Sequence, residues 1–216
     1  MLRIAIFFIS LVSLTVNAES LEPIDKVPDD IKSAKVIIPI YSQKLAFRLP
    51  TDWKPAFKDQ NANMFMIEFT PKNESIKSWS NLLSVQGFKN LAARGSSEQF
   101  LDQLASVFKS TCGEYLIYEK IDSPIIDGYE STSAILGCSK MPKSHQSGVK
   151  KGQSEVGYYH SIRGEKDIYF IHKSIRGDSF ENSKPPLTKD NVASFFKSFM
   201  PIELCQNSGG QAECIK

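Results

Sequence analysis

Two histidines, His160 and His172, are the residues best placed for chemistry, because they lie on segments that read as the two arms of a hairpin. If the turn centres on Glu165, Tyr158 faces His172 and His160 faces Phe170, so that both imidazoles share one sheet face diagonally. Such a pair is a candidate metal site. No third ligand is evident, and a shift of one residue in the pairing would separate the two side chains. Ordinary sheet-face histidines are the alternative that we favour.

The four cysteines predict disulfide bonds, because an even number in an exported chain is typical of a stapled fold. Four cysteines allow three pairings, of which we favour Cys112–Cys138 and Cys205–Cys214. The first bond would tie a helix end to a strand, and the second would close a short loop through residues 208–210. A zinc site would use close pairs such as C-x-x-C, and the sequence contains none. Free or metal-bound thiols are the alternative.

The remaining sequence offers no motif for catalysis or cofactor binding. There is no G-x-S-x-G motif to supply an activated serine. The pair Gly209-Gly210 is followed by no helix that could form a phosphate site. The strand acids Glu68, Glu119 and Glu130 could each face solvent. The sequence therefore predicts no catalytic residue and no cofactor, and it favours a protein that is not an enzyme.

A lysine-rich segment over residues 140–153 is the candidate surface for a partner. Lys143, Lys150 and Lys151 could recognise an acidic molecule there, although a charged loop is more often simply solvated. The whole chain carries a formal net charge of +2, and removal of Arg3 would leave +1. This weak charge suggests neither nucleic acid nor an anionic membrane as partner. A protein or a small ligand is the expected partner.

The N-terminus is typical of an exported protein. Arg3 precedes a charge-free, mostly apolar run over residues 4–16, and Ala18 ends a sequence that a signal peptidase accepts. The run is too short to span a membrane, and no later segment of the mature chain could do so. We therefore predict a signal peptide over residues 1–18 and a periplasmic or secreted mature protein. An uncleaved anchor or a buried N-terminal helix is the alternative.

The mature chain reads as one domain of ordinary globular composition, with 41% apolar and 23% charged residues. Residues 19–34 predict a flexible arm, residues 35–204 a single domain and residues 205–216 a tail. Alternating apolar residues predict strands over 45–49, 65–69, 79–88, 115–121, 131–139, 155–163 and 167–175, with 36–38 as an extra edge and 54–63 as an exposed loop.

Two helices interrupt this series of strands. Ser96 and Gln99 form a capping box before an apolar stripe that ends at Gly113. Thr188 is the expected cap of a second helix that stops before Pro201. Together these elements predict an α+β fold, in which an antiparallel sheet is flanked by helices as an α/β/α sandwich and is stapled by disulfides.

One segment resembles a known family. Residues 47–53 place Phe47, Pro50 and Trp53 in the spacing F-x-x-P-x-x-W, which is similar to the opening of the superfamily of PsbP-like, Mog-type and DcrB-like proteins. The order of predicted elements is also similar to that family's α/β/α sandwich. Members mostly act as binding or accessory proteins, so the resemblance implies such a role and carries over no catalytic residue. The four cysteines and the C-terminal extension depart from the simplest members.

These observations favour an exported, non-enzymatic binding or accessory protein of the periplasm or extracellular space. Two alternatives stay open at this point. One is a secreted factor that acts on another cell through its loops. The other is a hydrolase or metal enzyme whose site the sequence does not reveal.

Overall fold

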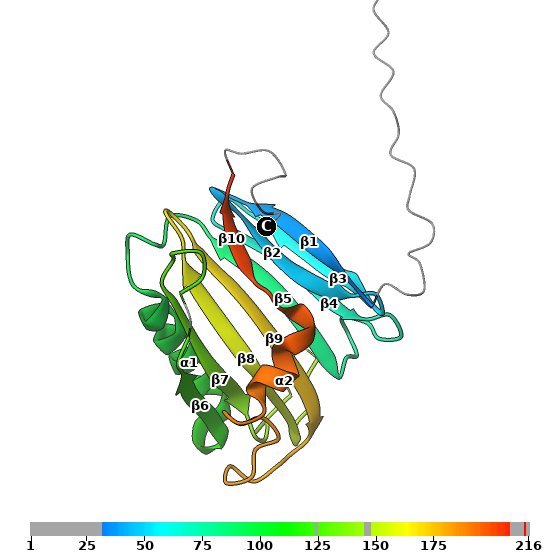
Figure 1. The fold of residues 1–216 in the computed structure, drawn as a ribbon. Helices are drawn as coiled ribbons and strands as arrows, with labels where there is room; N and C mark the ends of the chain where they lie inside the picture. Colours follow the sequence, from blue (N-terminus) through cyan, green and yellow to red (C-terminus); the bar gives the residue numbers. More distant parts are fainter. Residues whose placement is uncertain (1–31, 124, 145–147, 208–213, 215–216) are drawn as a thin grey trace, which may run out of the picture.

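The computed structural model describes residues 32–123, 125–144, 148–207 and 214. The predicted signal peptide over 1–18, most of the predicted arm over 19–34 and residues 208–210 lie outside these ranges. Within these ranges, ten antiparallel strands dominate the fold and form two sheets (Figure 1). No helix in the described ranges is long and apolar enough to cross a membrane.

The larger sheet contains seven strands, and every strand pairs antiparallel with its neighbours. Across the sheet the strands follow the order β3 (Trp53–Gln60), β4 (Met64–Pro71), β5 (Asn81–Phe88), β9 (Ile168–Asp178), β8 (Gln153–Arg163), β7 (Ser131–Cys138) and β6 (Leu116–Ile121). The smaller sheet has the order β1 (Ser33–Ile40), β2 (Gln43–Pro50) and β10 (Glu203–Gln206).

The main core lies between the two sheets. Leu45 and Phe47 of β2 pack against Leu83 and Ile171 of the large sheet, and Phe47 meets Phe69 edge to face at 5.9 Å between ring centroids. A short helix α2 (Val192–Phe196) and a 3₁₀ turn at Lys197–Phe199 close the same side of the core (Figure 1). One face of the large sheet is therefore covered by the small sheet together with α2.

Helix α1 (Ser97–Cys112) covers part of the opposite face. It packs against β6, β7 and β8 through residues such as Leu101 and Ala105. The predicted capping box is confirmed, since Ser96 Oγ accepts from Gln99 N while Gln99 Oε1 accepts from Ser96 N. Gly113 ends the helix with φ of 62°, a value that favours glycine.

Both predicted disulfides are confirmed. Cys112–Cys138 ties the end of α1 to the end of β7, and Cys205–Cys214 joins β10 to Cys214. At its other end, α1 is held by Glu130, whose Oε1 accepts hydrogen bonds from Ser97 N at 2.9 Å and Ser97 Oγ at 2.8 Å. The helix is therefore fixed at both ends to the two ends of β7.

The prediction of two helices as the outer layers of a sandwich is correct on one side only. A three-stranded sheet, rather than a helix, forms most of the second layer, so the fold is dominated by antiparallel sheet. Helix α2 is only five residues long, and its N-cap is Asn191 rather than the predicted Thr188. The 3₁₀ turn that follows α2 ends before the cis peptide Met200–Pro201.

Three segments predicted as irregular contain strand residues. The expected loop over 54–63 contains most of the edge strand β3. Its apolar alternation is obscured by Pro55, several charged residues and a bulge between Pro55 and Phe57. The predicted tail contributes Cys205 and Gln206 to β10, and β1, which contains the predicted extra edge over 36–38, begins at Ser33 inside the predicted arm. Each of these three strands lies at the edge of a sheet and pairs with only one neighbour. The alternation of apolar and polar residues is weakest in such edge strands.

We expect that removal of Cys112–Cys138 destabilises the protein more than removal of Cys205–Cys214. The bonds close segments of 26 and 9 residues, which predicts losses of about 3–4 and about 2–3 kcal/mol in the free energy of unfolding. Urea denaturation of the double variants Cys112→Ser/Cys138→Ser and Cys205→Ser/Cys214→Ser measures both values. Equal midpoints for the two variants and the wild type would contradict the expectation.

Candidate functional site

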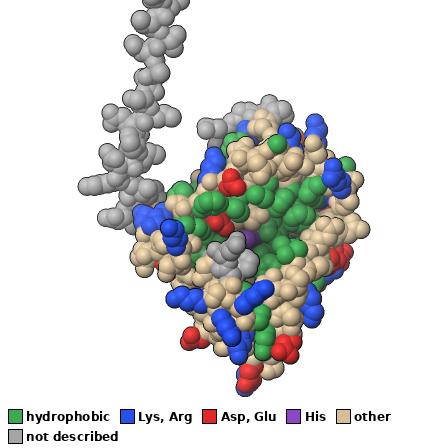
Figure 2. Space-filling view, turned by 180° about the vertical axis from the view of Figure 1, so that it is seen from behind, with side chains coloured by type: hydrophobic (Ala, Val, Ile, Leu, Met, Phe, Trp, Pro, Cys, Tyr) green, Lys and Arg blue, Asp and Glu red, His purple; other side chains and the backbone are tan. Residues whose placement is uncertain are grey.

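A cavity of about 540 Å³ lies beside helix α1, where the helix leaves the large sheet uncovered. Strands β4, β5, β8 and β9 contribute its floor, and α1 contributes one wall. Seen from behind, the molecule shows hydrophobic side chains gathered around a hollow, with a histidine at its base (Figure 2). Cavities of this size and lining are typical of small-molecule sites.

The floor is built from residues that alternate along the strands. Phe170, His172 and Arg176 point to the cavity from β9, because every second side chain of a strand lies on the same face. The pairing places Glu68 opposite Ser84, Ser84 opposite His172, and His172 opposite Tyr159. A row of four polar or aromatic side chains therefore crosses four adjacent strands on the cavity side.

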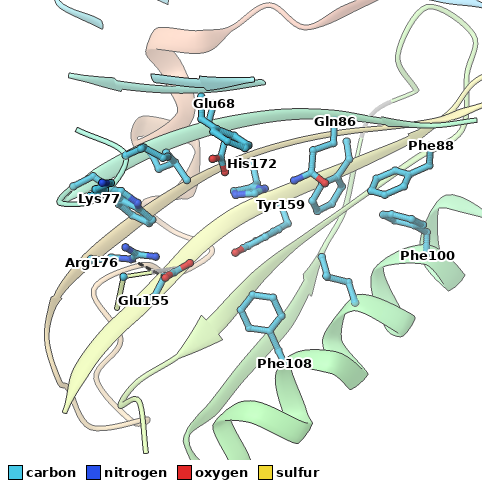
Figure 3. Close-up of a pocket in the computed structure, with 17 residues that line it drawn as sticks. Glu68, Lys77, Gln86, Phe88, Phe100, Phe108, Glu155, Tyr159, His172 and Arg176 are labelled. Carbon is cyan, nitrogen blue, oxygen red and sulfur yellow. Dashed lines mark hydrogen bonds and ion pairs between the residues drawn. The ribbon is translucent and has the colours of Figure 1, made fainter. Parts of the chain in front are cut away.

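Aromatic rings form the apolar wall between the sheet and α1. Phe100 of the helix lies 4.9 Å from Phe88 and 5.6 Å from Phe170, measured between ring centroids. About two helical turns further along the wall, Phe108 meets Tyr159 at 5.9 Å. Figure 3 shows Phe88, Phe100 and Phe108 along one side of the cavity. The wall presents flat aromatic surface along the length of the helix.

Charged residues gather at the opposite end of the cavity. Arg176 Nε donates to Glu155 Oε2 at 2.8 Å, and both side chains are largely buried. The Arg176 guanidinium also lies 3.6 Å from the centre of the Trp79 ring. Lys77 borders this end from an exposed position (Figure 3). Contacts with Glu155 and Trp79 therefore hold the arginine side chain in place as part of the cavity wall.

His172 occupies the middle of the floor. Only 9% of the residue is exposed, and its ring stacks on Tyr159 at 4.5 Å between centroids with an angle of 23° between planes. Burial lowers the pKa of His172 to about 3, so the imidazole is neutral at pH 7. Its Nδ1 atom is buried without a hydrogen-bond partner among the described residues.

Glu68 is the acid nearest to this histidine in the row. Burial raises the pKa of Glu68 above its ordinary value, the charge of Glu155 adds to the increase, and Arg176 opposes it. Ser84 lies between Glu68 and His172 in the register, but it is fully buried and its Oγ accepts from Gln86 Nε2 at 3.1 Å. The row therefore presents hydrogen-bonding groups to the cavity and no exposed serine nucleophile.

The predicted facing of His160 and His172 is wrong. The hairpin pairs Tyr159 with His172 and His160 with Ile171, one residue away from the expected register. The cause is Asp167, which belongs to the turn rather than to β9: its carboxylate accepts from Ser42 N at 3.0 Å and Asn90 N at 2.8 Å. The two histidines consequently lie on opposite faces of the sheet.

His160 faces the core below α2 and does not join the cavity. Its Nδ1 lies 2.9 Å from Ser133 Oγ and 3.2 Å from Tyr158 Oη, and burial lowers its pKa to about 4. Among the residues that the structure describes, no group of three or more histidine, cysteine or acidic side chains could hold a metal ion. The geometry that would make His160 and His172 a metal pair is therefore absent.

The other residues singled out in the sequence are scattered over the surface. Lys143, Lys150 and Lys151 are exposed, and the loop that carries them is anchored by the buried side chains of Met141 and Val149 against the Cys112–Cys138 bond. Glu119 forms a surface ion pair with Lys189 at 3.4 Å, whereas Glu130 holds the start of α1. Recognition of an acidic partner by the lysines stays a prediction.

Sequence reasoning missed Gln86, Glu155 and Arg176 as cavity residues and left Glu68 as an acid that could face solvent. These side chains come from four strands spread between residues 64 and 178. The available signal is the alternation in β9, where Phe170, His172, Ser174 and Arg176 share a face that is less apolar than the core face. That pattern is typical of a face that is only partly covered.

Comparison with known proteins adds no functional assignment. No protein-family model matches the chain, and no curated protein sequence matches it. One solved structure with some likeness is a crystal structure of a protein from Bacteroides thetaiotaomicron, with a TM-score of 0.43 and 11% sequence identity. The match covers 83% of this chain and 51% of that chain, so this chain spans about half the length of that protein.

We expect His172 to make the protein sensitive to acid. Below its ordinary pKa of 6.5 the unfolded chain binds a proton on this side chain that the native state binds only near pH 3. The free energy of unfolding should therefore fall as the pH falls from 6.5 towards 3, by about 1.4 kcal/mol per pH unit for such a group. His160, with its pKa of about 4, adds a similar contribution.

Urea denaturation at pH 7 and pH 4.5 measures this effect. In His172→Phe and in His172→Gln the loss of stability between the two pH values should be smaller than in the wild type by roughly 2–3 kcal/mol. The glutamine variant is the control for packing, because glutamine is polar and does not titrate. Parallel pH profiles in the wild type and both variants would contradict the assignment.

Proposed function

We propose that this protein is an exported, non-enzymatic binding protein that holds a small apolar molecule in the cavity between α1 and the large sheet. The observation that carries the proposal is an aromatic-lined hollow of about 540 Å³ on a sheet face that α1 covers only in part. Binding sites for small molecules combine a mostly apolar lining with a few well-placed polar groups. The cavity has this composition.

The other features of the chain support the same proposal. Two disulfide bonds suit an oxidising compartment, which agrees with the predicted signal peptide and with a periplasmic or secreted location. A binding or accessory role is also what the resemblance to the PsbP-like, Mog-type and DcrB-like superfamily implies. Membership of that superfamily is part of this proposal.

Titration with the apolar dye N-phenyl-1-naphthylamine tests the proposal on the mature chain. Saturable fluorescence enhancement is expected, because the aromatic wall shields the dye from water. Leu104→Trp places a large side chain in the cavity from α1 and should weaken the binding at least tenfold. Ser106→Trp adds the same bulk at an exposed position of the same helix and should leave the affinity unchanged.

The tryptophans of the chain provide a second measurement. Trp79 lines the cavity, whereas Trp53 packs in the core against Phe199 at 5.1 Å between ring centroids. In Trp53→Phe the remaining fluorescence of Trp79 should change as the dye binds. Equal dye binding by the wild type and Leu104→Trp, with no response of Trp79, would disprove the proposed site.

A further inference from the structure

The buried imidazole of His172 has a ring nitrogen without a hydrogen-bond partner in the part of the chain that the structure describes. A buried polar atom without a hydrogen bond costs free energy, and native structures contain few of them. Nδ1 of His172 is such an atom, and the ring that carries it borders the cavity. Figure 3 shows this ring between Glu68 and Tyr159, at the centre of the site. Because Nδ1 itself is almost inaccessible, a ligand would bond the imidazole through the part of the ring that borders the cavity.

His160 differs from His172 because the protein supplies partners for its Nδ1, although its Nε2 is also buried without a partner among the described residues. Ser133 and Tyr158 both reach its Nδ1, so the protein constrains which nitrogen carries the proton. His172 instead has ring contacts, to Tyr159 at 4.5 Å and to Phe170 at 5.6 Å between centroids, which fix the position of the ring but not its tautomer. The neutral ring can therefore serve as donor or as acceptor.

The charges around the cavity do not favour an ionic ligand. Glu68 and Glu155 supply two carboxyl groups, and Arg176 and Lys77 supply two cations. Arg176 is paired with Glu155 at 2.8 Å and covered by Trp79, so an anion would have to compete with an existing ion pair. An anionic group at His172 would also lie near the carboxyl group of Glu68, because only Ser84 separates Glu68 from His172 in the cross-strand row.

On the basis of the proposed function, we propose that the ligand is an uncharged ring compound with a hydroxyl group that hydrogen-bonds to His172. A hydroxyl group both donates and accepts, so it matches a neutral imidazole in either tautomer. The body of the ligand would lie along Phe88, Phe100 and Phe170, whose rings favour stacked or edge-to-face contact with another ring. Phe108 and Tyr159 extend the same surface.

A pair of matched probes separates the hydroxyl group from the apolar body. 2-Naphthol and 2-methylnaphthalene have nearly the same size and shape, and both are uncharged at pH 7. Calorimetric titration of the mature wild-type protein and of His172→Phe gives four affinities. The ratio of the affinity for 2-naphthol to the affinity for 2-methylnaphthalene should be lower in His172→Phe than in the wild type by a factor of about five or more, because one hydrogen bond is lost. The comparison of ratios cancels the different hydration of the two probes.

His172→Gln is the conservative variant, because its amide keeps a donor and an acceptor. It should restore part of the ratio, which a purely structural role of the histidine would not produce. A second readout needs no substitution: in nitrogen-15 spectra of the wild type, 2-naphthol should shift the ring nitrogens of His172 and 2-methylnaphthalene should leave them in place. The chain has three histidines, so the signals can be assigned.

The outcomes distinguish this inference from the proposed function. Binding of both probes with an unchanged affinity ratio, and with no selective shift of the His172 nitrogens, would overturn the role of the hydroxyl group while the cavity remains a binding site. Failure of the wild type to bind either probe would overturn the proposed function itself. A lowered ratio together with the selective shift would support both.

Discussion

The seven-stranded sheet has two faces to cover, and helix α1 is too narrow to cover one of them alone. A helix is about 10 Å wide, whereas seven strands spaced about 4.8 Å apart form a much broader surface. The small sheet and α2 cover one face, and α1 lies over β6, β7 and β8 on the other. Strands β4, β5 and β9, which α1 does not cover, form the floor of a cavity together with part of β8. The candidate site therefore follows from the incomplete second layer.

The register of the β8–β9 hairpin decides which side chains reach that floor. Asp167 accepts hydrogen bonds from Ser42 and Asn90 and therefore belongs to the turn. The turn is one residue longer than the predicted turn over residues 164–166. Because side chains alternate along a strand, this one residue moves His160 to the core and leaves His172 on the cavity side. A contact far from the site in sequence thus selects the histidine at its centre.

The parts of the fold that depend on local patterns could be predicted from the sequence. The capping box at Ser96, the end of α1 at Gly113 and the central strands all follow from short-range rules, and the disulfide pairing followed from the expected positions of those elements. Strand β3 could not be predicted, because Pro55 and its charged neighbours look like a loop at a sheet edge. The cavity could not be predicted either, because Glu68, Gln86 and His172 meet only through strand pairing.

The attachment of α1 at both ends has a consequence for the energetics of recognition. Glu130, which directly precedes β7, holds the first residue of the helix, and the Cys112–Cys138 bond ties the last residue to the end of β7. One wall of the hollow is therefore preorganised, so binding of the proposed ligand would require little ordering of the main chain. Under reducing conditions the Cys112–Cys138 bond would be lost, and the end of α1 could move away from the sheet. Binding of the proposed ligand would then depend on the redox state of the compartment.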